Sequence, residues 1–569
     1  MNITQSNFFS LLLGNKQYQI PIYQRNYTWT TLECKKLLED IIACGTPGNP
    51  NHYVGSVIVK SEQGVGGLDI FNVIDGQQRT TTISLLLLAL SEYYSGHNTF
   101  AVSQNVALLL SNVKNNYLVN TSFSQTSLFT KISLKSGSDR NEYDNLIHNV
   151  SGNGRISGNY QFFLREMQNR NINPQTVFDG INNAQIALVT LNAGENPQLL
   201  FEAVNDTGID LTEVDKVRNW IFMGLSMTEQ DRLYRAYWQT VENMLGQYLN
   251  NFLRYFIIVK TLRNIGNEYY KAFKTQFLLS IGNAQSVEDL LAEIQIYATI
   301  YNKYLESSFT PDSLNTQIEL IKITRKDLFI PVILKIIRLC ENNLINPADT
   351  IMMLRYIESY IVRRDILNIP TNSLTPAMIN LLNGCDSLQN LIATISALSY
   401  RQRMPDNQEL HTQLKTQNFY QLPFAYNYLE RLEKSVNPAF ALADPTIEHI
   451  LPETMHDTAN PKPGATRPDD YNWELDLGQD AKRIHDTYQH TLGNLTILPR
   501  GENSRMGDYR FDIKKNWTAS GPDGFIYGYS HTPIRISQGL RTVTVWDETS
   551  ILNRCDQLVN IICNVWPHP

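Results

Sequence analysis

The spacing of apolar residues changes along the chain and predicts structurally different regions. Within residues 30–44 apolar residues recur at helical spacing, whereas residues 52–60 and 68–74 are rich in β-branched and aromatic residues. The glycine-rich residues 61–67 lie between the latter two segments. The pattern predicts a helix followed by a β-hairpin, and residues 184–191 are a further strand candidate in a mostly helical stretch.

Residues 226–425 show almost only helical periodicity with short polar connections, which predicts a helical bundle. Farther on, proline, glycine, asparagine, tryptophan and aspartate become dense in residues 456–480, which predicts a long loop. Short strand candidates follow, and a helix is predicted at residues 548–566. We therefore expect a predominantly α multidomain protein with α+β ends, divided into residues 1–225, 226–425 and 426–569.

Composition limits the class of protein. Apolar residues make up 42% and charged residues 18% of the chain, as in ordinary soluble proteins. The longest apolar run, residues 85–90, is too short to cross a bilayer, and the N-terminus lacks the features of an export signal. The six cysteines are scattered without a C-x-x-C pair, which argues against a zinc ribbon or a disulfide scaffold. We therefore expect a cytoplasmic protein with no membrane partner.

The formal charge of −7 argues against a generally basic DNA-binding surface. Phosphate neutralisation supplies much of the affinity of DNA-binding proteins, so any contact with nucleic acid must come from local basic patches. Residues 500–515 are a candidate, since they hold five basic and three acidic residues.

The stretch "VIDGQQRTTT" at residues 73–82 joins a predicted strand to a predicted helix. We expect the strand to end at Ile74 and the helix to begin near Thr80, with Gly76 allowing a tight turn. The first amides of a helix and the guanidinium of Arg79 suit phosphate oxygens, and Asp75 can hold a cation. The alternative is that Asp75 caps the helix and Arg79 is a surface charge.

A second polar cluster, Tyr23, Gln24 and Arg25, lies in the aromatic stretch "IPIYQRNYTW" at residues 20–29. By itself this stretch is better explained by core aromatic residues beside solvated Gln24 and Arg25. Together with residues 73–82, however, it strengthens the prediction of a phosphate-binding site.

Polar residues suited to phosphodiester hydrolysis cluster near the C-terminus, in "PTIEHILPE" (445–453) and "HTLGNLTILPRGENSRMGDYRFDIKK" (490–515). A hairpin followed by a helix can supply a neutral imidazole from His449, an asparagine that fixes its loop, Asn494, and a ligand from the helix, Asn503. The alternatives are a satisfied half-buried histidine and an ordinary turn asparagine.

Taken together, the N-terminal stretches closely resemble the N-terminal domain of the GmrSD family of modification-dependent (type IV) restriction enzymes. The family patterns I-P-x-Y-Q-R-x-Y-x-W and I-D-G-Q-Q-R-x-T-T both occur, and "FEAVNDTGIDLTEVDKVRN" at residues 201–219 matches a third, with Arg218 where lysine is common. The resemblance implies a ParB/sulfiredoxin-like α/β fold that binds and hydrolyses a nucleoside triphosphate (GTP, ATP or CTP). The nucleotide-binding residues it implies are Tyr23, Gln24, Arg25, Asp75, Gly76, Gln77, Gln78, Arg79 and Thr80.

The C-terminal pattern, E-H-I-x-P followed by L-G-N-L-T-x-L and a later asparagine, resembles HNH (ββα-metal) nucleases and in particular the GmrSD C-terminal domain. The closing "VWDETSILNRCDQLVNIICNVWP" also matches that family. The resemblance implies His449 as general base and Asn494 as the residue that positions its loop. It further implies Asn503 and either Glu448 or a residue of the loop that follows as ligands of Mg²⁺ or Mn²⁺. Arg505 and Lys514, both on the predicted helix, would contact the DNA backbone.

We therefore predict a single-chain, nucleotide-regulated, metal-dependent endonuclease that restricts modified phage DNA. Its partners would be double-stranded DNA and a nucleotide, and a homodimer is allowed. One alternative is a phosphorothioate-sensing NTPase that licenses a nickase, and another is a nucleotide-dependent DNA-binding protein without cleavage. The presence of His449, Asn494 and Asn503 speaks against the last alternative.

Overall fold

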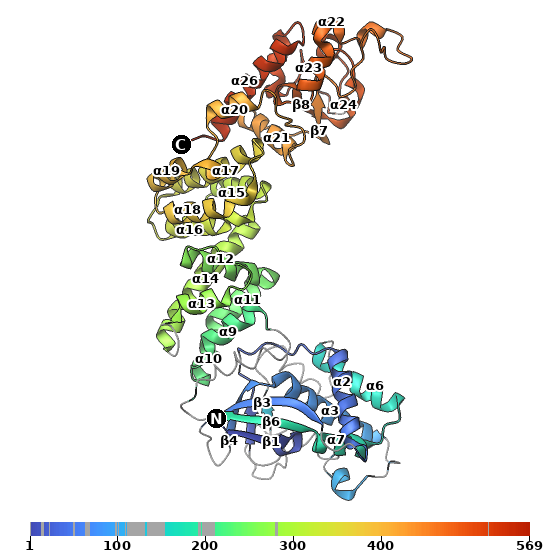
Figure 1. Ribbon diagram of the computed structural model, residues 1–569, viewed down its shortest axis with the longest axis vertical. Helices are drawn as coiled ribbons and strands as arrows, with labels where there is room; N and C mark the ends of the chain where they lie inside the picture. Colours follow the sequence, from blue (N-terminus) through green and yellow to red (C-terminus); the bar gives the residue numbers. More distant parts are fainter. Residues whose placement is uncertain are drawn as a thin grey trace. The chain divides into compact units, whose positions relative to one another are not determined.

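The computed structural model describes residues 2–12, 16–21, 23–48, 52–62, 69–96, 100, 102–108, 110, 131–133, 154–191, 195, 211–278, 283–521 and 523–569 (Figure 1). The chain divides into two compact units. The first holds Met1–Leu253 and Asn267–Ile296, and the second holds Arg254–Gly266 and Tyr297–Pro569. This division is coarser than the three expected domains, whose boundaries stay predictions.

The N-terminal region is built on a six-stranded mixed sheet with the strand order β1-β6-β3-β4-β2-β5. Its strands are β1 (Asn2–Asn7), β2 (Lys16–Gln19), β3 (Tyr53–Glu62), β4 (Asp69–Asp75), β5 (Lys131–Ser133) and β6 (Gln185–Leu191). β3 pairs antiparallel with β4 and parallel with β6. The predicted antiparallel strand pair and the predicted strand at residues 184–191 are therefore confirmed; the residues between β3 and β4 lie outside the described residues.

Helices α2 (Thr31–Gly45), α3 (Gln77–Gly96), α6 (Arg155–Asn169) and α7 (Pro174–Asn183) share one hydrophobic core with this sheet, and the short α1 (Phe8–Leu12) joins them. α2 confirms the helix predicted at residues 30–44, and Thr30 and Glu33 form a capping box at its start. Two glycines let α2 and α7 approach closely: a Cβ at Gly45 would lie 1.8 Å from the carbonyl oxygen of Thr176. A Cβ at Gly180 would lie 1.9 Å from the carbonyl oxygen of Ile41.

Both boundaries at the junction of β4 and α3 differ from the prediction. β4 ends at Asp75, one residue after the expected Ile74. The helix begins at Gln77, three residues before the expected start near Thr80, because Gly76 alone makes the turn. Gly76 has φ +89°, and a Cβ there would lie 2.9 Å from the carbonyl oxygen of Ser56. Glycine is therefore required by both backbone conformation and space.

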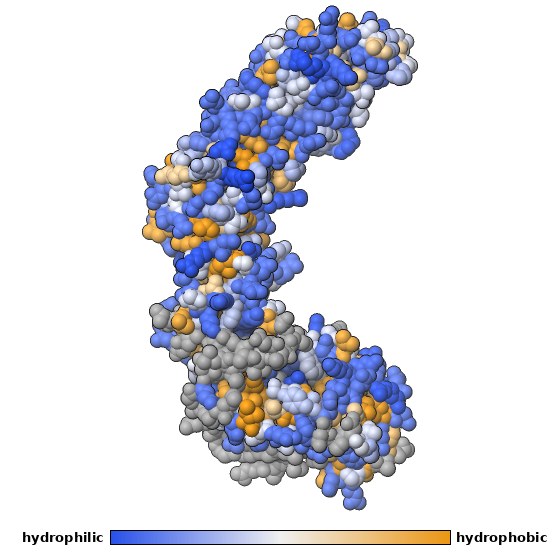
Figure 2. Space-filling model, viewed as in Figure 1, coloured by the Kyte–Doolittle hydropathy of each residue, from blue (hydrophilic) through white to orange (hydrophobic). Residues whose placement is uncertain are grey.

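The described part of residues 226–425 is helical, as predicted, and contains no strand. The helices from residue 213 onward are α9 (Glu213–Phe222), α10 (Met227–Leu233), α11 (Gln239–Leu245), α12 (Leu249–Thr261), α13 (Tyr270–Gln276), α14 (Ala284–Glu306), α15 (Asp312–Ile323), α16 (Ile330–Glu341), α17 (Pro347–Ile366), α18 (Leu374–Gly384), α19 (Leu388–Ala397), α20 (Asn407–Gln413) and α21 (Ala425–Val436). Along the described residues, no helix is both long and apolar enough to cross a membrane. The visible surface of these helices is mostly hydrophilic, with scattered hydrophobic spots (Figure 2).

The C-terminal region contains a two-stranded antiparallel sheet followed directly by a helix. β7 (Pro445–His449) pairs with β8 (Leu495–Pro499), and α24 (Arg500–Met506) continues from β8. The predicted long loop, residues 456–480, consists mostly of turns but contains the short helix α22 (Glu474–Leu477). Helix α23 (Ala481–Tyr488) follows it. α25 (Phe511–Lys515) follows α24, and α26 (Glu548–Val565) confirms the predicted closing helix.

Candidate functional site

Two buried glutamines connect the stretches at residues 20–29 and 73–82. Gln24 Nε2 donates to the carbonyl oxygen of Ile74 over 3.0 Å. Gln78 Oε1 accepts from the amide of Thr28 at 2.8 Å, and its Nε2 donates to the carbonyl oxygen of Asn26 at 3.1 Å. The two motifs are thus adjacent in space, and both glutamine side chains hold the loop of residues 23–28 against the turn.

The third motif reaches the same loop through α9. Arg218 Nε donates to the carbonyl oxygen of Tyr23 over 2.6 Å, and Nη1 donates to Glu242 Oε1 at 2.6 Å. Its Nη2 bonds to Asp215, and the guanidinium is buried. The structure therefore brings the described parts of all three N-terminal motifs together around residues 23–28, although residues 201–210 lie outside the described residues.

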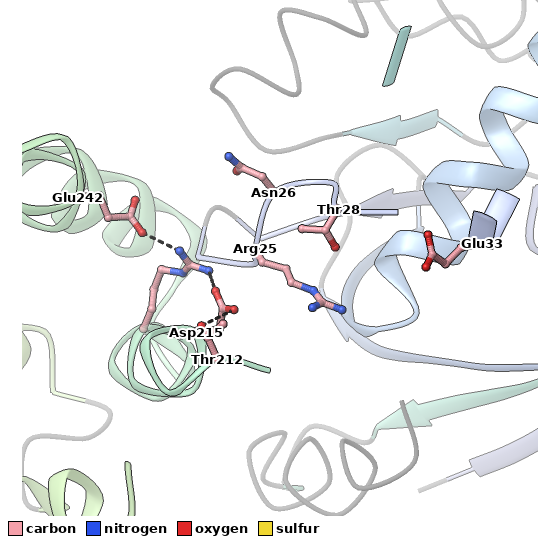
Figure 3. Close-up of a pocket in the computed structure, with 8 residues that line it drawn as sticks. Arg25, Asn26, Thr28, Glu33, Thr212, Asp215 and Glu242 are labelled. Carbon is pink, nitrogen blue, oxygen red and sulfur yellow. Dashed lines mark hydrogen bonds and ion pairs between the residues drawn. The ribbon is translucent and has the colours of Figure 1, made fainter. Parts of the chain in front are cut away.

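A pocket of about 540 Å³ lies beside this loop (Figure 3). It is lined by Arg25, Asn26, Thr28, Glu33, Thr212, Asp215, Arg218 and Glu242. The half-buried Arg25 extends between Asp215 and Glu33 (Figure 3). The three acidic side chains are already engaged, two by Arg218 and Glu33 by the amide and hydroxyl of Thr30, both at 2.6 Å. Among the described residues, no hydrogen bond or ion pair engages Arg25, which leaves its charge available to an anion.

The other residues of the turn are more restricted than the sequence suggests. Arg79 Nη1 donates to the carbonyl oxygen of Ser56 at 2.9 Å, and its guanidinium packs so closely on Gly55 that a Cβ there would lie 2.4 Å from Cζ. Burial lowers the pKa of Arg79. Thr80 Oγ1 donates to the carbonyl oxygen of Gly76 at 2.8 Å, and Gln77 is buried.

In the second unit, His449 ends β7 and its ring is nearly buried. His449 Nε2 lies 3.0 Å from His490 Nδ1, so one of the two imidazoles donates to the other. Tyr420 packs on both rings, with centroid distances of 4.5 Å to His449 and 5.4 Å to His490. Burial, together with the charges of His490, Lys514 and His485, lowers the pKa of His449 to about 3, which keeps its ring neutral.

Asn494 fixes the backbone immediately after His449. Its Oδ1 accepts from the amide of Leu451 at 2.7 Å and from Trp546 Nε1 at 3.1 Å. Its Nδ2 donates at 2.8 Å to the carbonyl oxygens of both Leu451 and Gln489. All of the side chain's polar capacity is therefore used in a fully buried position.

We expect Asn494→Ala to destabilise the C-terminal region by about 3 kcal/mol or more, because it leaves several buried polar groups without partners. Hydrogen exchange of peptides that contain Leu451 in the full-length protein measures this, and exchange should accelerate strongly. Asn516 is the matched control: it is exposed, and within the described part of the chain its side chain hydrogen-bonds to Asp512 alone. Asn516→Ala should leave that exchange unchanged, and equal effects of the two substitutions would contradict the role of Asn494.

Glu448 and Lys514 lie in the interior. Lys514 Nζ donates to Glu448 Oε1 at 2.7 Å and to the carbonyl oxygens of His449 and Ile450 at 3.0 and 3.1 Å. Lys514 is 0% exposed, and Tyr529 also donates to Glu448. The structure therefore does not place Lys514 where it could reach DNA or Glu448 where it could hold a metal ion.

The remaining predicted residues lie on α24. Asn503 Nδ2 donates to Thr446 Oγ1 at 2.9 Å and to the carbonyl oxygen of Ile447 at 2.8 Å, which ties the helix to β7. Arg505 is exposed and donates to the carbonyl oxygen of Ser520 at 3.2 Å, besides its ion pair with Glu502. Of the two predicted DNA contacts, only Arg505 lies at the surface.

The sequence interpretation missed His490 and Tyr420, which flank His449. A signal existed for His490, since it stands two residues before the L-G-N-L-T stretch and can ionise. Tyr420 carried none, because it lies in the loop between α20 and α21, far from His449 in sequence.

Comparison with known families gives two matches. Residues 8–222 match the GmrSD restriction endonuclease N-terminal domain, and residues 404–561 match the GmrSD restriction endonucleases C-terminal domain. No curated protein matches the chain. The second match begins upstream of β7 and includes Tyr420, in agreement with a hydrophobic core that joins Leu410 and Phe419 to β8 and α26. The chain therefore carries both domains of the GmrSD family on one polypeptide, and these domains indicate a restriction endonuclease of the type IV kind.

Proposed function

We propose that the C-terminal site is an HNH-type nuclease centre in which His449 activates the water that attacks a DNA phosphodiester. The observation that carries this proposal is the position of His449 at the end of an antiparallel strand pair that runs directly into α24. An imidazole fixed on such a frame can take the proton from an attacking water. The match to the GmrSD C-terminal domain supports DNA as the substrate.

Three neighbours support His449 in this role. His490 Nδ1 can accept the Nε2 proton of His449, which leaves the lone pair on Nδ1 of His449 for the water. Asn494 and Lys514 hold the backbone that follows the ring. A bound scissile phosphate would raise the pKa of His449 from its low value by its negative charge, which makes the imidazole a better base in the complex.

The expected metal ligands fit only in part. Glu448 faces Lys514 in the interior, so its carboxylate cannot also meet a metal ion at the surface. The side-chain nitrogen of Asn503 already donates to the backbone of β7, so only Oδ1 is left as a candidate ligand. When bound, Mg²⁺ or Mn²⁺ would stabilise charge on the phosphate.

We further propose that the pocket beside residues 23–28 binds the phosphates of a nucleoside triphosphate and that its occupancy regulates the nuclease. Its volume of about 540 Å³ lies within the usual range of small-molecule sites. Arg25 is favoured over Arg79 as the phosphate contact, since Arg79 is already bonded to Ser56. Regulation requires the nucleotide to bind one conformation of the protein more tightly than another. A cytoplasmic location and a homodimer stay predictions.

We expect Arg25→Gln to weaken binding of GTP, ATP or CTP by roughly 10- to 100-fold, which corresponds to the loss of a charge-assisted hydrogen bond. Binding of fluorescent analogues of the three nucleotides to the full-length protein measures the effect. Arg165→Gln is the control, because Arg165 is exposed on α6 of the same region. Unchanged affinity in Arg25→Gln would contradict the proposed phosphate contact.

The nuclease proposal is tested by cleavage of modified phage DNA, followed on native and denaturing gels so that nicks and double-strand breaks are both seen. The full-length protein should cut this DNA with Mg²⁺ or Mn²⁺ and stop when a chelator removes the metal ion. Absence of cutting with either ion, with and without each nucleotide, would contradict the nuclease proposal.

A further inference from the structure

Three potential metal ligands converge at the end of β7. His449 Nε2 and His490 Nδ1 lie 3.0 Å apart, and Glu453 Oε1 lies 4.0 Å from each of them. Among the described residues, no other histidines, cysteines and carboxylates form such a group of three. Two imidazole nitrogens and a carboxylate oxygen form a common ligand set for a tetrahedral zinc ion with one open position.

The spacing suits a tetrahedral ion after a small adjustment. Metal–ligand bonds of about 2.0–2.1 Å place neighbouring ligand atoms about 3.3 Å apart, close to the separation of the two imidazole nitrogens. Glu453 is 55% exposed, so its carboxylate can rotate toward the histidines. The rings themselves are held, since Tyr420 packs on both and its amide donates to the carbonyl oxygen of His490 at 3.2 Å.

The ligand types and charges favour a transition-metal ion over Mg²⁺. Imidazole nitrogen suits Zn²⁺, whereas Mg²⁺ prefers oxygen ligands and keeps much of its water. The nearest buried cation, Lys514, is balanced by Glu448, and Glu453 adds a negative charge beside His449 and His490. The ion pair of Lys514 and Glu448 therefore leaves no uncompensated positive charge that would repel a divalent cation.

We propose that His449, Glu453 and His490 bind Zn²⁺ and that this ion inhibits the nuclease. The inhibition, unlike the binding, rests on the proposed function of His449. An ion on His449 Nε2 takes the lone pair of that nitrogen and replaces the hydrogen bond with His490, so the proton of the neutral ring lies on Nδ1. Nδ1 then has no lone pair to accept a proton from the water, so Zn²⁺ switches off cleavage that Mg²⁺ or Mn²⁺ supports.

Zn²⁺ affinity is measured on the full-length protein by competition with a chromophoric chelator, and the visible spectrum of bound Co²⁺ reports the coordination geometry. Glu453→Gln and His490→Asn should each weaken Zn²⁺ binding at least about tenfold, because each removes one of three protein ligands. The exposed His531 provides the control His531→Asn, which should bind as the wild type does. Co²⁺ should give the strong absorption of four-coordinate geometry in the wild type and in His531→Asn, but not in Glu453→Gln or His490→Asn. Equal Zn²⁺ affinity of the wild type and His490→Asn would overturn the proposed site.

Cleavage assays separate this inference from the nuclease proposal. In excess Mg²⁺, Zn²⁺ should inhibit the wild type, whereas Glu453→Gln should cleave normally without Zn²⁺ and resist inhibition. A wild-type protein that cleaves DNA but neither binds Zn²⁺ at this site nor is inhibited by it would overturn the inference alone. A protein that binds Zn²⁺ through these residues but cleaves no DNA would support the metal site and contradict the nuclease proposal.

Discussion

His449→Ala is expected to reduce metal-dependent DNA cleavage roughly 100- to 10,000-fold, which is the usual contribution of a general base. The expected loss follows from geometry. His449 ends β7 beside His490, and Asn494 and Lys514 hold the chain that follows it, so the proposed base is held in a fixed position. The rate at which the full-length protein cleaves modified phage DNA measures the effect.

The control for this experiment is His531→Ala, which removes an exposed histidine from the same unit. It should cleave as the wild type does. Near-ultraviolet circular dichroism should show that His449→Ala remains folded, since its ring has one side-chain hydrogen bond to lose. Cleavage by folded His449→Ala at the wild-type rate would contradict the role of His449 as base.

Lys514→Met is expected to destabilise the second unit by about 3–5 kcal/mol, the cost of leaving a buried carboxylate without its partner. Lys514 makes an ion pair with Glu448 and two bonds to backbone carbonyls, all in the interior. Burial already raises the pKa of Glu448 and Lys514 opposes that rise, so removal of the lysine favours the protonated acid. Chemical unfolding and local hydrogen exchange of the full-length protein measure the loss.

The double substitution Glu448→Leu with Lys514→Met should recover much of that stability, because no charge is then left in the interior. Lys482→Met is the control, since Lys482 is exposed on α23. If Lys514 served instead as a DNA contact, Lys514→Met would leave the stability unchanged and weaken DNA binding with a reduced salt dependence.

The regular elements are those that the sequence predicts best. β3, β4, β6 and α26 lie where their apolar spacing indicates, because burial of one face imposes that spacing directly. The turn at Gly76 was also predictable, although its helix begins at Gln77. A glycine between a strand pattern and a helix pattern indicates a tight turn, because the conformation of a turn depends mainly on local sequence.

The directions of polar side chains were harder to predict. Gln24 and Gln78 stand in a ligand-like motif, yet they bond to backbone groups about fifty residues away, and local sequence does not reveal such partners. Lys514 was expected on one helix with Arg505, but Gly507, with φ +40°, ends α24 and the chain turns before α25. That break directs Lys514 inward.

The inward direction of Glu448, by contrast, could have been predicted from the sequence. Successive strand residues point to opposite faces, so the placement of His449 at the site already implied that Glu448 faces away. The family pattern, which pairs the two residues as base and ligand, outweighed this alternation in the sequence interpretation. Tyr420 joins the site only through tertiary packing, which no local sequence pattern indicates.

We propose that this chain cuts modified DNA under the control of a nucleotide. The direct test is to incubate the full-length protein with modified phage DNA and with the unmodified counterpart. Each incubation contains Mg²⁺ or Mn²⁺, with and without GTP, ATP or CTP. We predict cleavage of the modified DNA alone, at a rate that depends on one of the nucleotides. Equal cleavage of both DNAs, independent of every nucleotide, would contradict this proposal.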